Sequence, residues 1–125
     1  MATILTLHHA ALTVPTSGLE EARRFYSGLL GLEEAPRPEA ELGRPGIWYR
    51  LGETELHIQC RDEGPGQPGE YHPALLVDDV PGLRAHLASN GVTIIDAQPL
   101  NDRERFFARD PFGNRIEFLS QPGGR

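Results

Sequence analysis

The sequence predicts an α+β fold built from two copies of one βαβββ module, and three observations carry this prediction. A strand-like motif occurs twice, as HAALTV at residues 9–14 and as HPALLV at residues 72–77. Each copy is followed by apolar residues at helical spacing. Each half of the chain then closes with two strand-like runs around a tight turn. A repeat with these parts in the same order indicates two copies of one supersecondary unit.

The first module is predicted to begin with a strand that ends at Pro15. Ser17 and Glu20 form a capping-box pattern at the start of a helix, and an apolar stripe at helical spacing follows them. Gly31 supplies the left-handed residue that commonly ends a helix. A turn-rich connection, residues 36–45, precedes the closing hairpin. The predicted strands of this module are residues 5–14, 32–35, 47–51 and 55–60.

The second module is preceded by residues 61–70, whose glycines and prolines predict a linker. Asp79 is the expected N-cap of a helix that runs to about Asn90 and closes at Gly91. The last two strands flank the DPFGN segment, residues 110–114, which has the composition of a tight turn. The predicted strands of this module are residues 72–77, 92–95, 105–109 and 115–119.

The chain of 125 residues is predicted to form a single domain, residues 1–125. Module 1 is expected at about residues 5–60, the linker at about 61–70 and module 2 at about 71–120. The formal net charge of −6 argues against nucleic acid or an anionic membrane as partner. No apolar run approaches the roughly 20 residues that span a bilayer. Cys60 stands alone, so no intrachain disulfide is possible, and we expect a cytoplasmic protein.

Polar residues occupy equivalent positions in the two modules. His9 matches His72 in the repeated motif, and His57 matches Glu117 in the last strand of each module. Side chains alternate along a strand, so the apolar residues of these strands share the face that is expected to pack on the helices. The opposite face carries the ionisable residues and is predicted to line a solvated or metal-coordinating site.

Two imidazoles and one carboxylate on rigid strands form a facial ligand set for a divalent transition metal. His9, His72 and Glu117 are the candidate ligands. Fe(II), Mn(II), Co(II), Ni(II) or Zn(II) would each suit such a set. The alternative is that both histidines hydrogen-bond to neighbours or to solvent. The repeat and the presence of Glu117 favour the metal.

Four sequence segments resemble the vicinal oxygen chelate superfamily, which includes glyoxalase I, methylmalonyl-CoA epimerase, fosfomycin-resistance thiol transferases, bleomycin-resistance proteins and extradiol dioxygenases. The resemblance implies two βαβββ modules that form a curved mixed sheet around a central cavity. It places His9, His72 and Glu117 on the usual metal-ligand positions. Many members of this length are homodimers with ligands supplied across the interface, so we expect a homodimer that binds a small molecule. The segments are HHAALTV (8–14), RFYSGLLGL (24–32), VDDV (77–80) and RDPFGNRIE (109–117).

The chain departs from the best-known activities of this superfamily at several positions. His57 occupies one of these positions. By the resemblance, bacterial-type glyoxalase I has a Glu at the equivalent position, and methylmalonyl-CoA epimerases have a Gln. The epimerase's catalytic Glu has no acidic counterpart in residues 47–51. Ala11 stands where the fosfomycin enzymes carry a Thr. His57 can still bind a metal or move a proton, because its charge changes near neutral pH, and it is the candidate catalytic base.

Four further residues are candidates for contact with the substrate. Phe107 and Arg105 share the face of the ligands if the last hairpin alternates regularly. Trp48 or Tyr49 adds an aromatic wall from the first module, and the sequence leaves open which of them points inward. Gln59 shares a strand face with His57. The arginines of this region alternate with acidic residues, so an exposed, salt-bridged surface is the alternative for them.

The leading functional hypothesis is a glyoxalase-like, metal-dependent lyase or isomerase. The resemblance implies that one divalent metal ion per site acts as a Lewis acid on substrate oxygens, and that a nearby base moves a proton. A second hypothesis is a metal-free protein that sequesters a small molecule such as an antibiotic. A third is a small Fe(II) dioxygenase. The substrate depends on loops whose conformation the sequence does not reveal.

Overall fold

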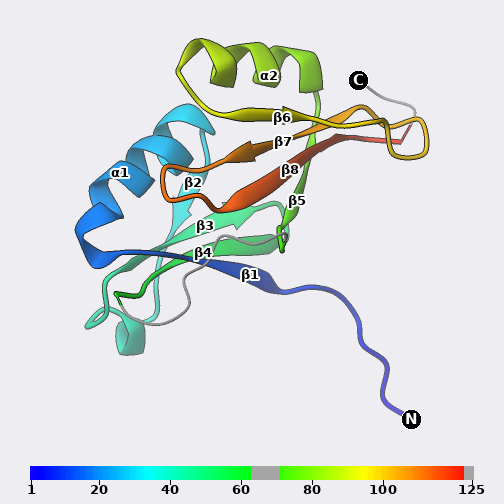
Figure 1. Ribbon diagram of the computed structural model, residues 1–125. Helices are drawn as coiled ribbons and strands as arrows, with labels where there is room; N and C mark the ends of the chain where they lie inside the picture. Colours follow the sequence, from blue (N-terminus) through cyan, green and yellow to red (C-terminus); the bar gives the residue numbers. More distant parts are fainter. Residues whose placement is uncertain (63–70, 123–125) are drawn as a thin grey trace. The chain divides into compact units, whose positions relative to one another are not determined.

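The computed structural model of the chain describes residues 1–62 and 71–122 (Figure 1). It divides into two compact units, residues 1–66 and 67–125, and each described part contains one four-stranded sheet. No helix within the described residues is long and apolar enough to cross a membrane.

The first unit has the strand order β1-β4-β3-β2. β1 pairs in parallel with β4, and β3 is antiparallel to both of its neighbours. A 3₁₀ turn, a short α-helix and a π-helical segment connect β1 to β2. The elements are β1 (His9–Val14), η1 (Thr16–Gly18), α1 (Leu19–Arg23), η2 (Arg24–Leu29), β2 (Glu33–Ala35), η3 (Glu39–Glu41), β3 (Gly46–Leu51) and β4 (Thr54–Cys60).

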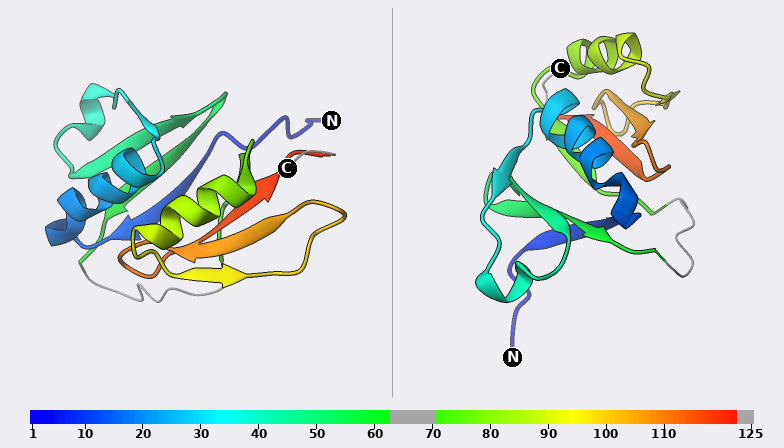
Figure 2. Two further views of the ribbon diagram at one scale, coloured as in Figure 1. Left: turned by 90° about the horizontal axis from the view of Figure 1, so that it is seen from above. Right: turned by 90° about the vertical axis from the view of Figure 1, so that its left-hand side faces the viewer.

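The second unit repeats this topology with the strand order β5-β8-β7-β6. β5 pairs in parallel with β8, and β7 is antiparallel to both of its neighbours. The helix α2 packs against β6, β7 and β8, and lies on one side of the sheet in both views of Figure 2. The elements are β5 (Ala74–Val77), α2 (Val80–Ser89), β6 (Ile94–Asp96), β7 (Arg105–Arg109) and β8 (Arg115–Ser120).

The predicted α+β fold with two βαβββ modules is confirmed, because both units show the same order of elements and two mixed sheets. Most of the predicted linker, residues 61–70, lies outside the described residues, and the grouping of both modules into one domain stays a prediction. Four strands begin later than expected: β1 at His9, β2 at Glu33, β5 at Ala74 and β6 at Ile94. His72 therefore precedes its strand.

The start of the first helical segment differs from the predicted capping box. The side chain of Ser17 caps nothing; the residues around it form the 3₁₀ turn η1. The carboxylate of Asp62 supplies the acceptors instead. Its Oδ1 lies 2.7 Å from the backbone N of Thr16, and its Oδ2 lies 2.9 Å from Thr16 Oγ1. The hydrogen bond from the Thr16 backbone lowers the pKa of the Asp62 carboxyl, so it stays ionised and acts as an acceptor.

The core of the first unit settles which aromatic residue of β3 faces the helical segment. Tyr49 is fully buried, and its hydroxyl lies 2.8 Å from Ser27 Oγ in η2. Its ring lies 5.9 Å from that of Tyr26. Leu56 and Ile58 of β4 are buried as well. Because side chains alternate along a strand, Trp48 lies on the opposite face.

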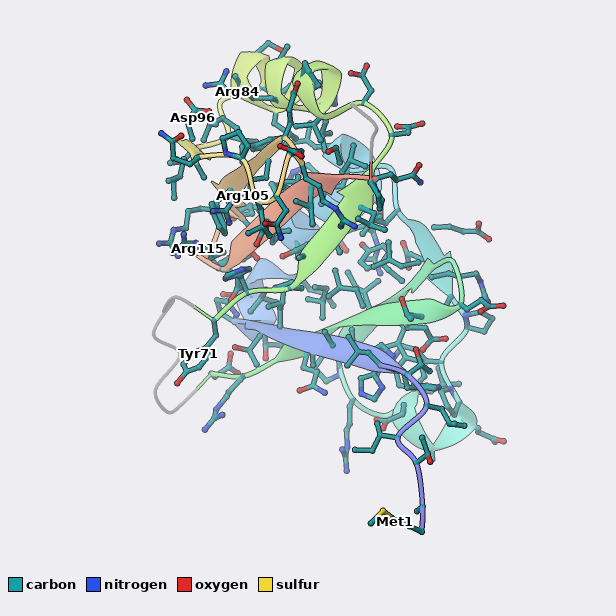
Figure 3. The ribbon with its side chains drawn as sticks, turned by 90° about the vertical axis from the view of Figure 1, so that its right-hand side faces the viewer. Met1, Tyr71, Arg84, Asp96, Arg105 and Arg115 are labelled. Atoms are coloured by element: carbon teal, nitrogen blue, oxygen red, sulfur yellow. The ribbon has the colours of Figure 1, made fainter. Side chains whose placement is uncertain are left out.

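The core of the second unit forms where α2 covers its sheet. Phe106 and Phe118 stack with ring centroids 5.0 Å apart, and Leu87 of α2 is fully buried. Asp79 is the N-cap as predicted, since its Oδ1 accepts a hydrogen bond from the Gly82 backbone at 3.0 Å. The middle of α2 is tied to β6 by Arg84 and Asp96, which lie side by side in Figure 3.

The DPFGN turn is organised by one buried carboxylate. Asp110 is 4% exposed, and its Oδ1 accepts hydrogen bonds from the backbone N of Phe112 and of Asn114, both at 2.8 Å. Its Oδ2 accepts from the Asn114 side-chain amide at 2.8 Å. These contacts hold the turn between β7 and β8 and so fix the position of β8.

We expect Asp110→Ala to lower the free energy of unfolding by about 2–3 kcal/mol, because buried N–H groups lose their acceptor. Denaturant unfolding followed by circular dichroism measures this. Asp78→Ala is the matched control: Asp78 is exposed, and its loss should cost no more than about 0.5 kcal/mol. Equal stability of the two variants would show that the carboxylate does not organise the turn.

Candidate active site

His72 and Glu117 form a close pair in the second unit. His72 Nε2 lies 3.0 Å from Glu117 Oε1, and their side chains are 28% and 7% exposed. The topology explains the contact, because β5 pairs in parallel with β8 and the Glu117 backbone N donates to the carbonyl of Pro73 at 3.0 Å. The backbone therefore holds the two side chains at one end of the β5–β8 pair.

Arg105 and Phe107 of β7 surround this pair. Arg105 donates from Nη1 to Glu117 Oε2 at 3.4 Å and from Nε to the carbonyl of Gln98 at 2.8 Å. Phe107 pairs with Glu117 in the β7–β8 register and meets the His72 ring edge to face, with centroids 5.0 Å apart. The orientation of Glu117 is therefore set by His72 on one carboxylate oxygen and by Arg105 on the other. Hydrogen bonds of this kind to a ligand side chain orient metal ligands in proteins.

The His72–Glu117 geometry fits a divalent metal ion. Two donors bound at about 2.1 Å in adjacent octahedral positions are about 3.0 Å apart. Imidazole nitrogen and carboxylate oxygen are common donors for first-row transition metals. The pair therefore presents two ligand atoms at a spacing that an ion could bridge.

In the first unit, His57 lies between two other rings. The ring of Trp48 stacks on it at 3.9 Å between centroids and 3° between planes. The ring of His9, on the neighbouring strand β1, also stacks on His57, with 4.2 Å between ring centroids and 15° between ring planes. The register places Trp48 of β3 directly opposite His57 of β4. His9 of β1 is opposite Glu55, two residues before His57, so its contact with His57 is diagonal. His57 is only 3% exposed, so its ring plane is fixed.

Glu55 determines which nitrogen of His57 carries a proton. His57 Nε2 lies 2.8 Å from Glu55 Oε1. This hydrogen bond lowers the pKa of the Glu55 carboxyl, so Glu55 is ionised at neutral pH. An ionised carboxylate only accepts hydrogen bonds, hence Nε2 is the donor. In neutral His57 the basic lone pair is therefore on Nδ1.

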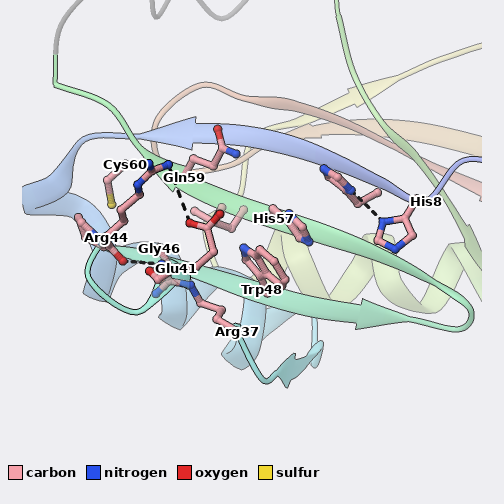
Figure 4. Close-up of a pocket in the computed structure, with 12 residues that line it drawn as sticks. His8, Arg37, Glu41, Arg44, Gly46, Trp48, His57, Gln59 and Cys60 are labelled. Atoms are coloured by element: carbon pink, nitrogen blue, oxygen red, sulfur yellow. Dashed lines mark hydrogen bonds and ion pairs between the residues drawn. The ribbon is translucent and has the colours of Figure 1, made fainter. Parts of the chain in front are cut away.

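A pocket of about 500 Å³ opens beside this stack (Figure 4). Trp48 and His57 form one wall of it, and the loop before β3 forms another. Burial raises the pKa of the Cys60 thiol, which keeps this lining residue protonated and weakly reactive. The pocket is lined by His8, His9, Arg37, Glu41, Arg44, Pro45, Gly46, Trp48, His57, Ile58, Gln59 and Cys60.

Arg37 holds the loop wall of this pocket. Its Nη1 donates to the carbonyl of Gly46 at 3.1 Å, and its Nη2 donates to the carbonyls of Glu41 and Arg44. Gly46 also approaches Ile58 closely: a Cβ at this position would lie 2.8 Å from the Ile58 carbonyl oxygen. The loop is therefore fixed against β4 by its backbone, and its side chains remain available to shape the pocket.

The predicted site residues fall into a cluster in each unit. His9, Trp48 and His57 adjoin one another, and Gln59 lines the same pocket. His72, Glu117, Arg105 and Phe107 adjoin one another in the second unit. No group of three His, Cys, Asp or Glu side chains that could hold a metal is found among residues 1–62 and 71–122. The three-residue ligand set of His9, His72 and Glu117 therefore stays a prediction.

The sequence analysis assigned neither the loop contacts of Arg37 nor the hydrogen bond between Glu55 and His57. The spacing of Glu55 was a usable signal, because it is two residues from His57 and so shares its strand face. Arg37 acts on backbone carbonyls of a loop, a contact that no local sequence pattern indicates.

Comparison with known proteins identifies relatives over almost the whole chain. The model of the Glyoxalase/Bleomycin resistance protein/Dioxygenase superfamily matches residues 6–118. A crystal structure from Bacillus anthracis, described as a glyoxalase family protein, is 35% identical with a TM-score of 0.88, over 98% of this chain and 99% of that chain. No curated protein sequence gives a significant match.

Two more distant structures share the fold. Lactoylglutathione lyase from Agrobacterium tumefaciens is 20% identical with a TM-score of 0.73, over 94% of this chain and 95% of that chain. TnmS3, an antibiotic binding protein from Streptomyces sp. CB03234, is 21% identical with a TM-score of 0.74, over 98% of this chain and 100% of that chain. At these identities the likeness is one of fold alone, and it spans an enzyme and a binding protein.

Proposed function

The chain belongs to the glyoxalase/bleomycin resistance protein/dioxygenase superfamily, and on that premise we propose that it is a metal-dependent lyase or isomerase acting on a small oxygenated molecule. The observation that carries the proposal is the contact between His72 Nε2 and Glu117 Oε1 at 3.0 Å, backed by Arg105. A buried carboxylate that faces an imidazole at this spacing has the geometry of two adjacent metal ligands.

His9, His72 and Glu117 are the proposed ligands. A divalent transition metal bound there would supply Lewis-acid polarisation of substrate oxygens. Arg105 keeps Glu117 oriented through its second oxygen. His9 is exposed at the start of β1, stacks on His57 and has its Nδ1 3.0 Å from His8 Nδ1, so its ring direction is restricted.

His57 is the proposed catalytic base. Glu55 holds its Nε2–H, which leaves Nδ1 as the proton acceptor. The stack with Trp48 fixes the ring, and a fixed base avoids the cost of reorientation when the proton moves. Ionised Glu55 stabilises the imidazolium that forms when the proton arrives.

Trp48, Gln59, Arg105 and Phe107 are the proposed substrate contacts. Trp48 offers an aromatic wall to the pocket, and Gln59 offers an exposed amide beside it. Phe107 lies against His72, and Arg105 against Glu117, so each is placed next to a proposed ligand. This mixture of apolar walls with few polar groups is typical of small-molecule sites.

A substrate screen tests the proposed reaction. Adducts of 2-oxo-aldehydes with thiols and acyl-CoA epimers are offered to the protein in D₂O, and incorporation of deuterium is followed by NMR. We expect exchange or turnover that a chelator abolishes and that a divalent metal restores. Turnover that survives complete removal of metal would contradict the proposal.

A metal-free antibiotic- or small-molecule-binding protein is the second candidate, and the pocket beside Trp48 favours it. The pocket has an aromatic wall and about 500 Å³ of volume, enough for a small ligand. In that case ligand binding, followed by quenching of the fluorescence of Trp48, is unchanged by a chelator. Dependence of the same binding on metal would favour the enzyme instead.

We also propose that the protein is a cytoplasmic homodimer. The single cysteine fits a reducing compartment, and the superfamily premise supports assembly in pairs. Sedimentation equilibrium should give twice the mass of one chain, which is 13.8 kDa.

A further inference from the structure

Arg115 lies on the same sheet face as Glu117, two residues before it on β8. In the register it is opposite Arg109, while Glu117 is opposite Phe107. Its guanidinium carbon is 3.9 Å from the centre of the Phe107 ring, the same ring that meets His72. Arg105 approaches that ring as well, at 5.4 Å, and Figure 3 shows both arginines near the β7–β8 pair.

Among the described residues, none accepts a hydrogen bond from the side chain of Arg115. Its Nε is buried without a partner, and no hydrogen bond or ion pair joins its side chain to the part of the chain that is described. The two other arginines of this face are engaged: Arg105 with Gln98 and Glu117, and Arg109 with the carbonyl of Gly113. Since buried donors in proteins are nearly always paired, a half-buried guanidinium without an acceptor marks a place for an external one.

The charge of this face favours an anion. Arg105, Arg109 and Arg115 share it with one carboxylate, that of Glu117, although the whole chain has a net charge of −6. A divalent metal at the proposed ligands would add further positive charge. The planar fork of a guanidinium matches carboxylate and phosphate oxygens in a bidentate manner.

We propose that Arg115 binds an anionic oxygen group of the substrate, a carboxylate or a phosphate. The inference rests on the proposed function in treating Glu117 as part of the site, and it narrows the substrate to a small oxygenated acid. Residues two apart on a strand are separated by about 7 Å, so one small molecule can reach both side chains. Packing on Phe107 holds the guanidinium flat before the ligand arrives, which reduces the entropic cost of binding.

Anion binding to chelator-treated protein tests this assignment without any assay of turnover. Pyruvate and inorganic phosphate are the probes, methyl pyruvate is the uncharged comparison, and Kd is measured by NMR titration. We expect saturable binding of at least one anion and none of the ester. Arg115→Gln should weaken it at least tenfold. Arg115→Lys, which keeps the charge without the fork, should weaken it less. Tighter pyruvate binding indicates a carboxylate substrate, and tighter phosphate binding a phosphorylated one.

Arg84→Gln is the matched control, because it removes the same charge from the same unit. Arg84 pairs with Asp96 at the surface of α2, and its loss should change Kd less than twofold. Equal affinity in Arg115→Gln and Arg84→Gln, or no saturable binding of either anion to the native chain, would overturn the assignment. Metal content, measured on separate samples that have not been treated with a chelator, is expected to match that of the native chain in Arg115→Gln. Loss of anion binding with metal retained therefore separates this inference from the proposed function.

Discussion

Replacement of His72 by Ala is expected to abolish tight metal binding. The change removes one of two donor atoms that lie 3.0 Å apart and leaves Glu117 facing only Arg105. Loss of an outer contact to a metal ligand already costs about 10–100-fold in affinity, so we expect loss of the ligand itself to exceed 100-fold. Competition with a chromophoric chelator gives the affinity, and elemental analysis gives the metal content.

His86→Ala is the control for this experiment. It removes an imidazole from α2 of the same unit and should retain metal as the native chain does. Both variants need native-like circular dichroism for the comparison to hold. Equal metal affinity in His72→Ala and the native protein would remove His72 from the ligand set.

Replacement of His57 by Gln is expected to lower kcat by about 10²–10⁴-fold on the substrate that the screen identifies. Gln keeps a polar side chain beside Glu55 but has no group that gains and loses a proton near neutral pH. Single-turnover kinetics in D₂O, with and without the substitution, measures the proton-transfer step.

Metal content separates this chemical role from a structural one. We expect His57→Gln to retain metal, because the substitution keeps all three proposed ligands, although it removes the ring on which His9 stacks. Gln59→Ala, on the same strand face, is expected to act mainly on KM. A kcat within about threefold of the native value in His57→Gln would contradict the role of a base.

Much of the fold follows from local patterns, and the exceptions have specific causes. β7 is found at residues 105–109 as predicted, because a short apolar run flanked by arginines precedes a clear turn signal. The strand expected from residue 5 begins at His9. Its partner β4 begins at Thr54, one residue before the Glu55 that pairs with His9, so β4 offers no partner to residues 5–7. Leu5 and Leu7 are therefore 89% and 67% exposed. Likewise, Pro73 lacks the N–H that a strand beginning at His72 would need.

Contacts between distant residues explain what the sequence alone could not supply. Asp62 provides the acceptors at the start of the first helical segment, 46 positions from Thr16, in place of the nearby Ser17. Alternation placed Trp48 and Tyr49 on opposite faces without saying which was buried. The hydrogen bond between the hydroxyls of Ser27 and Tyr49 is consistent with burial of Tyr49, because a buried hydroxyl needs a partner.

The candidate site was partly predictable for the same reasons. The internal repeat brought His9, His57, His72 and Glu117 forward as equivalent positions, and the pairing of β5 with β8 explains why His72 meets Glu117. Three further hydrogen bonds depend on side-chain conformation, which the sequence does not reveal. They join Glu55 to His57, Arg105 to Glu117, and Arg37 to the carbonyl of Gly46. Arg115 shares its face with Glu117 by spacing, but only the structure shows that its buried Nε has no acceptor among residues 1–62 and 71–122.

Metal analysis of the native protein tests the central claim most directly. The protein is purified without chelators from cells supplied with all first-row transition metals, and its metal content is measured by inductively coupled plasma mass spectrometry. We expect close to one divalent transition-metal ion per chain in the native protein, and loss of this ion in His72→Ala. Metal-free protein from such cells would contradict it.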